Sequence, residues 1–220
     1  MENSVCGRDY NSGSHFKSKM YDEASKKLKV LLLAYAVIAI FDFLGILDIV
    51  SLVFSIVSIV MLFKLGENSD YFKAAAKLTI ASVVAVFILG LVGAYNDTIG
   101  FAVLTLVVTI ALAIAICWKE FDGMADLVED VDHGLYKKWK TYRYIYILGF
   151  TLATVGAVLV MTHMVYSAQT IMDLTQAVTN ANAMAMIMKI IDLLIEVVKC
   201  ALIFMEIKAL ENCSQNLSDE

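Results

Sequence analysis

Five charged residues lie within an otherwise apolar stretch near the C-terminal end of the chain. They follow one another at steps of 3, 4, 3 and 7 residues. At about 100° per residue, this spacing places all five within a sector of roughly 100° on one helix, and the remaining helix surface is almost wholly apolar. The five residues of this charged stripe are Lys189, Asp192, Glu196, Lys199 and Glu206.

Carboxylates and ammonium groups at this spacing can bind a cation, relay a proton or guide a small polar solute. A charge near the centre of a membrane-spanning helix costs about 2.5–3.5 kcal/mol, so such residues face protein or water rather than lipid. Asp192 and Glu196 are like charges one turn apart, which a bound cation or a shared proton would stabilise. We therefore expect an ion or transport site at Asp192, Glu196, Lys199 and Lys189.

The same stripe also has a purely structural interpretation. Lys189 with Asp192, and Glu196 with Lys199, are i,i+3 pairs of opposite sign that can neutralise each other. The stripe would then pair with a membrane partner or with a second copy of the chain. In that case the protein would be a non-catalytic assembly or regulatory subunit, and the sequence leaves both interpretations open.

Sequence motifs for catalysis or cofactor binding are absent. The chain has no GxxxxGK[ST] phosphate loop, no HExxH zinc motif and no GxSxG nucleophile motif. His163 can titrate near neutrality, but a lone histidine at a membrane interface is more often a hydrogen-bonded bystander. We expect no cofactor, no resident metal and no nucleic-acid partner, and enzymatic activity is the least favoured of the functions considered. The four cysteines, which we expect to be reduced, are Cys6, Cys117, Cys200 and Cys213.

The elements that carry these residues are predicted to be transmembrane helices. The chain is 60% hydrophobic and 18% charged, whereas soluble domains average about 45–50% apolar and about 25% charged residues. As a helix, about 20 apolar residues span the ~30 Å hydrocarbon core. Residues 110–117 are apolar on every side, unlike the alternating strands of a membrane barrel. The long stretches with almost no charge are residues 30–63, 78–95, 99–118 and 144–161.

Residues 30–63 are too many for one crossing, because a single helix of this length would be ~51 Å long. We predict two short helices, with Gly45 ending the first and Asp48 capping the second. Asp42 is then a turn residue near the outer surface. The basic residues support this hairpin, because with it 15 of the 17 lysines and arginines lie on one side of the membrane. An excess of basic residues is typical of the cytoplasmic side.

The predicted fold is an all-α integral membrane bundle of six transmembrane helices in the cytoplasmic membrane. The helices form three consecutive hairpins, with both termini in the cytoplasm. Residues 1–25 are predicted to be a disordered tail, 119–141 an amphipathic connector along the membrane surface, and 211–220 a second tail. Within residues 26–210, the helices are predicted at about 28–44, 48–65, 70–94, 97–118, 142–163 and 184–210.

Two further patterns predict how the bundle packs and where it meets the membrane surface. Gly149, Ala153 and Ala157 recur every four residues, a spacing that lets a neighbouring helix approach closely. Basic residues interleaved with aromatic ones are typical of an anchor at the inner headgroup region, where cations attract anionic lipid. The predicted anchor consists of Lys137, Lys138, Trp139, Lys140 and Arg143.

Overall fold

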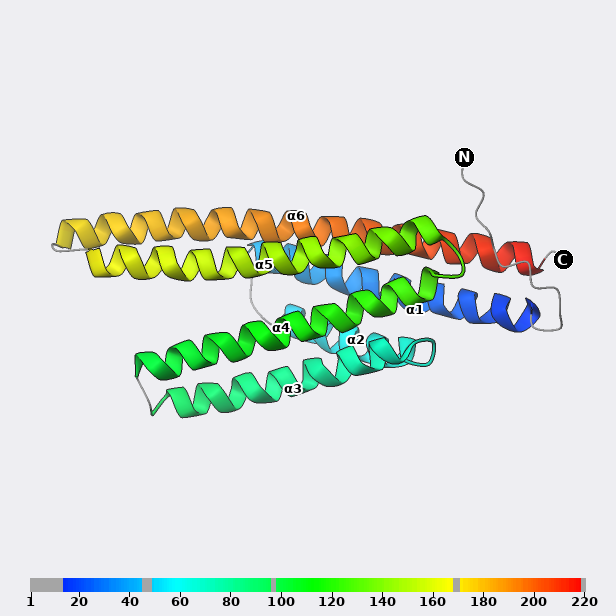
Figure 1. Ribbon diagram of the computed structural model, residues 1–220, viewed down its shortest axis with the longest axis horizontal. Helices are drawn as coiled ribbons and strands as arrows, with labels where there is room; N and C mark the ends of the chain where they lie inside the picture. Colours follow the sequence, from blue (N-terminus) through cyan, green and yellow to red (C-terminus); the bar gives the residue numbers. More distant parts are fainter. Residues whose placement is uncertain (1–13, 45–48, 96–97, 168–170, 219–220) are drawn as a thin grey trace.

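A computed structural model describes the backbone of residues 14–44, 49–95, 98–167 and 171–218. The description leaves out the side chains of residues 14–15, 99, 153 and 157–185. Within the described residues the chain forms six α-helices and no strand, which confirms the predicted all-α class and the number of helices (Figure 1). The helices are α1 (Ser14–Leu44), α2 (Ile49–Leu65), α3 (Asp70–Gly93), α4 (Ile99–Val128), α5 (His133–Ser167) and α6 (Ile171–Ser218).

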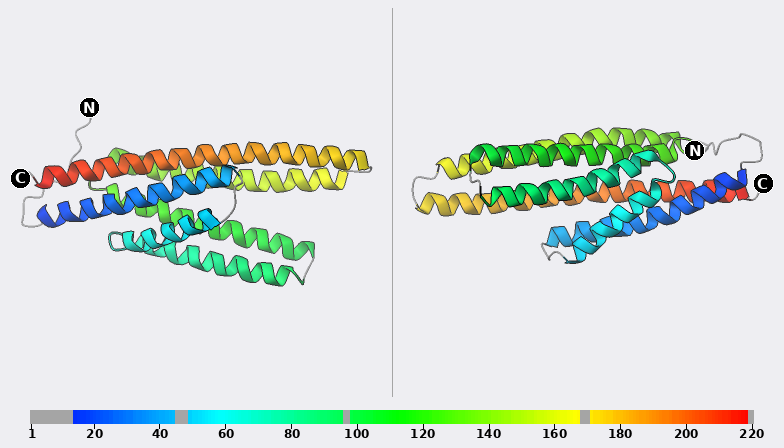
Figure 2. Two further views of the ribbon diagram at one scale, coloured as in Figure 1. Left: turned by 180° about the vertical axis from the view of Figure 1, so that it is seen from behind. Right: turned by 90° about the horizontal axis from the view of Figure 1, so that it is seen from below.

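Consecutive helices form hairpins of unequal length. The α5–α6 hairpin extends furthest at one end of the molecule, beyond the α3–α4 hairpin and the end of α1 (Figure 1). Each helix packs against the next one in the chain, and α6 packs back along α1, so that the six helices form a closed ring. The first described turn of α1 and the last turn of α6 lie side by side at the opposite end (Figure 2).

Local sequence explains the described helix boundaries. The turn between α2 and α3 is closed by the N–H of Gly66, which donates to the carbonyl oxygen of Leu62 at 2.9 Å. A Cβ at Gly66 would lie only 2.9 Å from the Cβ of Lys73, so this close approach favours glycine. At the start of α4, the Thr98 side chain accepts a hydrogen bond from the N–H of Phe101 and caps the helix.

Four helices are longer than the ranges that the sequence predicted. Residues 14–25, predicted to belong to a disordered tail, are helical and extend α1. In the predicted amphipathic connector 119–141, the first residues continue α4 to Val128, as the helical spacing of their apolar residues favours, and the last residues start α5 at His133. At its two ends, α6 includes residues 171–183 and 211–218, which were not predicted to be helical. The extensions of α1, α4 and α5, and the C-terminal one of α6, are helical because each has a face that packs into a shared core.

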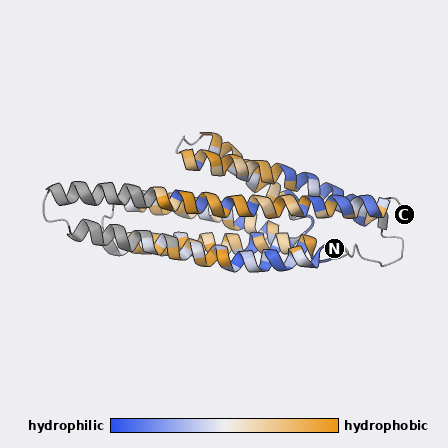
Figure 3. Cartoon of the chain, turned by 90° about the horizontal axis from the view of Figure 1, so that it is seen from above, coloured by the Kyte–Doolittle hydropathy of each residue, from blue (hydrophilic) through white to orange (hydrophobic). Residues whose placement is uncertain are grey.

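Almost all of the buried core of the described residues lies at one end of the bundle. We call this the polar end, comprising residues 16–31, 62–76, 119–143 and 199–218. Hydrophilic residues are concentrated at this end (Figure 3), while its interior contains fully buried large side chains. Among these are Leu28, Phe72, Phe121, Trp139 and Ile203.

The rest of the described bundle, which we call the apolar end, comprises residues 32–44, 49–61, 77–95, 98–118, 144–167 and 171–198. Many of its described large apolar side chains are exposed, as at Phe87, which is 66% exposed. In the described residues, Asp70–Gly93 and Gly100–Val128 are long and apolar enough to cross a membrane, and α2 is a shorter apolar helix. Only 11% of the most apolar window of the first helix is buried, and none of the second.

Some predictions fall outside the described residues. These are the turn at Gly45 and Asp48, residues 1–13 of the predicted tail, and the side chains of Ala153, Ala157 and His163. Of the predicted packing residues, Gly149 lies toward α6, because a Cβ there would be 4.0 Å from the Cδ1 of Ile195.

The prediction that all cysteines are reduced is wrong for one of them. Cys213 is disulfide-bonded, and its partner lies outside the described residues. The helical extension of α6 carries Cys213 into the buried core of the polar end, where it is only 4% exposed. Cys117 and Cys200 are free thiols and are half-buried.

Candidate functional site: a charged cavity between α1, α5 and α6

A half-open cavity of about 220 Å³ lies between α1, α5 and α6 at the apolar end. Three of the four predicted site residues line it: Lys189, Asp192 and Glu196. Asp42 enters the cavity from α1, and Tyr146 enters from α5. The structure therefore brings charged residues that are far apart in the sequence to one place.

The cavity exists because α6 separates two helices that do not meet. Both α1 and α5 pack on α6, but no contact joins α1 to α5 in the part of the chain that the structure describes. Residues 189, 192 and 196 lie at i, i+3 and i+7 and so share the face of α6 between its two neighbours. The gap between α1 and α5 thus leaves this face accessible.

The cavity is rich in negative charge. Asp42, Lys189 and Asp192 are exposed, and Glu196 is half-buried, so three carboxylates face a single ammonium group. Among the described side chains, no ion pair within 4 Å joins Lys189 to Asp192 or Glu196 to Lys199. The oppositely charged neighbours of the stripe therefore form no i,i+3 ion pairs along α6.

Lys199, the fourth predicted site residue, forms a buried ion pair beside the cavity. Its Nζ lies 3.0 Å from Oε1 of Glu120, and the two side chains are 7% and 6% exposed. The Nζ also lies 3.7 Å from the ring centroid of Tyr35, within the range of a cation–π interaction. Because a buried charge is costly unless it is paired, Glu120 and Tyr35 are what allow Lys199 to be buried.

Polar groups continue from the cavity to this ion pair. On α6, Glu196 lines the cavity and lies one turn before Lys199. On the opposite side, Tyr146 lines the cavity, and its ring packs against Phe121, the residue that follows Glu120. The cavity and the buried pair therefore lie next to each other, and we call the two together the polar path.

Aromatic side chains close this path toward the polar end. The ring centroid of Phe121 lies 5.2 Å from that of Tyr146, 5.4 Å from that of Tyr142 and 5.8 Å from that of Trp139. The hydroxyl of Tyr142 donates to the backbone oxygen of Ile195 at 2.6 Å and so ties α5 to α6. We call Phe121, Trp139, Tyr142 and Tyr146 the aromatic cluster.

Glu206, the last residue of the charged stripe, lies beyond the aromatic cluster in the polar end. It is fully buried, and its Oε2 accepts a hydrogen bond from Nε1 of Trp139 at 2.8 Å. Its Oε1 has no hydrogen-bond partner among the described residues. Burial raises the pKa of the Glu206 carboxyl well above its usual range, although the Trp139 hydrogen bond opposes this. The stripe is thus divided between an open cavity and a closed core.

The structure separates the residues of the predicted surface anchor. Lys137 and Lys138 are exposed at the polar end, as an anchor requires. Trp139 is instead fully buried and donates its indole N–H to Glu206. The reason is helical periodicity, which turns residue 139 to the opposite side of α5 from its two lysine neighbours.

The other two predicted anchor residues hold α5 against α4. Lys140 Nζ lies 2.7 Å from Oδ1 of Asp122, and Arg143, which is buried, pairs with the same carboxylate. The guanidinium carbon of Arg143 lies 4.1 Å from the ring centroid of Trp118. Among the predicted anchor residues, only Lys137 and Lys138 therefore remain candidates for contact with lipid headgroups.

Two members of the site, Asp42 and Glu120, were not predicted from the sequence. Asp42 was interpreted as a turn residue because it lies near the end of its helix, yet it lines the cavity. Glu120 follows an aromatic residue and a lysine, Trp118 and Lys119, and was assigned to the surface connector. A usable signal was its spacing, since Glu120 shares a helix face with apolar residues at positions 117 and 124.

The site can hold a positively charged group between carboxylates, with a tyrosine hydroxyl and an ion pair at its inner limit. No protein-family model, curated protein or solved structure matches this chain. The functional argument therefore rests on the geometry of the cavity and on the physical chemistry of its charges.

Proposed function

We propose that this chain is a multi-pass membrane protein that takes up a cation, a proton or a small polar solute along the charged face of α6. The supporting observation is the cavity itself. Asp42, Asp192 and Glu196 line it together with Lys189, and it leads to the buried Glu120–Lys199 pair. A net negative cavity favours a positively charged occupant.

In this proposal all six helices cross the cytoplasmic membrane. Their exposed apolar side chains at the apolar end favour contact with lipid, since apolar area on this scale is rare at the surface of a soluble monomer. The basic residues concentrated at the polar end favour a cytoplasmic location for that end and for both termini.

The occupant enters from the outer side and stops at the inner side. Asp42 lies two residues before the end of α1 at Leu44 and lines the cavity, which supports a cavity mouth near the outer surface. Toward the cytoplasm, the aromatic cluster fills the space beyond the Glu120–Lys199 pair. Complete transfer across the membrane requires this cluster to separate.

Flux measurements in proteoliposomes test this function. Purified protein is reconstituted, and proton, Na⁺ and K⁺ movement is followed under a pH gradient and under a membrane potential. We expect Asp192→Asn and Glu196→Gln each to lower flux by about tenfold or more, the equivalent of about 1.4 kcal/mol of cation binding. Asp126→Asn, at an exposed position of the polar end, is the matched control and retains full flux.

The outcome that rejects the proposal is equally clear. If the reconstituted wild-type protein moves no tested ion under either driving force, the cavity is not a transport path. Equal flux in wild type, Asp192→Asn and Glu196→Gln would show that these carboxylates do not carry it. Circular dichroism of each variant establishes that it has kept its helices.

A second function, an assembly or regulatory subunit of the membrane, is favoured by one observation. Lys189 and Asp192 are both exposed and make no ion pair with each other, so a partner or a second copy can complete their charges. Cross-linking in native membranes from a cysteine at Leu194, which is 60% exposed, tests this alternative. A specific cross-linked product supports it, whereas an uncross-linked monomer with cation flux rejects it.

A further inference from the structure

A second cavity lies between α1 and α6, where the polar end meets the apolar end. Its volume is about 390 Å³, and it is open to the outside of the bundle. It is separate from the charged cavity, with which it shares no lining residue. Its principal lining residues are Lys29, Leu33, Ala36, Phe204, Lys208 and Glu211.

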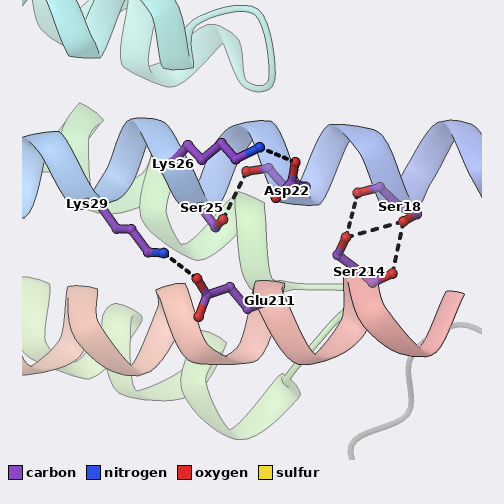
Figure 4. A network of polar contacts seen from close by, with 7 residues as sticks. All are labelled: Ser18, Asp22, Ser25, Lys26, Lys29, Glu211 and Ser214. Atoms are coloured by element: carbon purple, nitrogen blue, oxygen red, sulfur yellow. Dashed lines mark hydrogen bonds and ion pairs between the residues drawn. The ribbon is translucent and has the colours of Figure 1, made fainter. Parts of the chain in front are cut away.

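The inner edge of this groove is basic. Lys29 Nζ lies 2.5 Å from Oε1 of Glu211 (Figure 4), and Lys208 Nζ lies 3.7 Å from Oε2 of the same carboxylate. The hydrogen bond from Lys29 holds the pKa of the Glu211 carboxyl below its usual range, and Lys208 adds to this effect. Two lysines on one carboxylate leave a net positive charge, and their side chains are 55% and 59% exposed.

The outer part of the groove is apolar. Leu33 and Phe204 form opposite walls and are 58% and 53% exposed. Ile40 lies seven residues after Leu33 on the same face of α1, and Val197 lies seven residues before Phe204 on the same face of α6. Both lie further toward the apolar end and are 53% and 55% exposed. The groove therefore continues into two parallel apolar helix surfaces, with the lysines at one end only.

We propose that this groove binds an anionic phospholipid of the inner leaflet. Its phosphate contacts the exposed ammonium groups of Lys29 and Lys208, whose two charges Glu211 neutralises only in part, and an acyl chain follows Leu33 and Phe204 toward the apolar end. The arrangement matches the two parts of such a lipid, a negative headgroup followed by a long apolar chain. The proposal rests on the membrane location proposed above but not on transport through the charged cavity.

Charge complementarity selects this occupant over others. A zwitterionic phospholipid fits the apolar walls but gains less from two lysines, because its headgroup carries no net charge. Free phosphate fits the lysines but leaves Leu33 and Phe204 without a partner. The site therefore predicts preference for negative lipids over zwitterionic lipids, and no effective competition by phosphate alone.

Spin-labelled lipids measure this preference directly. The whole chain is reconstituted into phosphatidylcholine vesicles, and the immobilised fraction of spin-labelled phosphatidylglycerol is compared with that of spin-labelled phosphatidylcholine. We expect the wild type to prefer phosphatidylglycerol. In a Lys29→Gln, Lys208→Gln double variant, we expect the preference to fall by about fivefold for each lysine removed. The charge-conserving Lys29→Arg, Lys208→Arg variant keeps it.

A matched control separates a specific groove from general attraction to a basic surface. The Lys17→Gln, Lys19→Gln variant removes the same charge from exposed positions of the polar end outside the groove, and it retains the wild-type preference. The proposal is overturned if the wild type shows no preference, if the control loses as much as the groove variant, or if inorganic phosphate abolishes the preference.

The test also separates this inference from the proposed function. Protein that inserts and moves ions without any preference for phosphatidylglycerol rejects the lipid site and leaves the transport proposal standing. Protein that selects phosphatidylglycerol through Lys29 and Lys208 but moves no ion supports the lipid site and rejects the transport proposal. If the protein fails to associate with vesicles at all, both are rejected.

Discussion

The polar end and the apolar end of this bundle are built from the same helices but differ in where their large apolar side chains lie. At the polar end, Phe121 and Trp139 are almost completely buried, and charged side chains cover the surface. At the apolar end, Phe87 and Leu152 are more than 60% exposed. The polar end resembles a soluble helical bundle with its own core. The apolar end lacks such a core, and its apolar helix faces are exposed.

This difference explains how charges are held in the two regions. At the polar end and its border, Lys199, Asp122 and Arg143 are buried in ion pairs, and Glu206 is buried against an indole N–H. In the apolar end, Asp192 and Lys189 have no such partners and line an open cavity. Charges that are satisfied within the protein stabilise the fold, whereas the unsatisfied ones identify the candidate site.

Replacing one phenylalanine in each region is the strongest test of this comparison. Phe121→Ala removes a ring from the aromatic cluster, and we expect it to lower the free energy of unfolding by about 3–5 kcal/mol. Phe87→Ala removes a ring from an exposed surface, and we expect little change in detergent. Thermal unfolding followed by circular dichroism measures both variants. Equal destabilisation would show that the two ends are packed alike.

The buried ion pair provides a second test, with a somewhat smaller effect. Glu120→Gln leaves Lys199 buried without a counter-charge, and we expect a loss of about 3 kcal/mol, because breaking a buried pair is costly. A Glu120→Gln, Lys199→Met double variant should regain most of the stability, since neither charge is then left unpaired. Both are measured by thermal unfolding in the same detergent.

The control for this prediction is an exposed pair. Asp22→Asn disrupts the ion pair with Lys26 on the surface of the polar end, and exposed pairs of this kind contribute little to stability. Its melting temperature should equal that of the wild type. If Glu120→Gln has no more effect than Asp22→Asn, the Glu120–Lys199 pair does not hold α4 to α6.

The helical class, the number of helices and the shared face of Lys189, Asp192 and Glu196 could be predicted because they follow from apolar length and helical period. Whether each charged side chain is paired or left in the cavity could not be predicted. That outcome depends on which side chain of a neighbouring helix lies opposite it on α6. At Lys199 the neighbour supplies Glu120, and at Asp192 it leaves a gap. Such partners are far apart in the sequence, so spacing within one helix carries no information about them.

The extension of α1 was missed for a related reason. Residues 14–25 have few large apolar residues, which is typical of a disordered tail. They are helical because Tyr21 and Ala24 pack into the polar end, and because the hydroxyl of Ser18 donates to the backbone oxygen of Ser214 at 2.9 Å (Figure 4). Small residues on one face are enough to pack a helix where the partner helix approaches closely. Here the partner is the last part of α6, which is far from α1 in the sequence.

The pH dependence of stability is the finest test of the comparison, because it concerns one proton in the polar end. Burial raises the pKa of Glu206 in the folded protein well above the ordinary carboxyl value that it has when unfolded. Below that ordinary value both states are protonated, and the group has no effect. As pH rises above it, the unfolded state loses the proton first, so stability falls until the pKa of the folded state is reached.

Glu206→Gln replaces the titratable carboxyl with an amide that does not titrate, and the amide oxygen can still accept a hydrogen bond from the indole N–H of Trp139. We therefore expect the wild type to lose melting temperature between mildly acidic and mildly alkaline pH, and the variant to lose less of it. Glu211→Gln is the matched control on the same helix, because Lys29 lowers the pKa of Glu211 and gives its contribution the opposite sign. If Glu206→Gln melts with the same pH dependence as the wild type, Glu206 is ionised in the folded protein, and the polar end must then contain a cation or water that neutralises it.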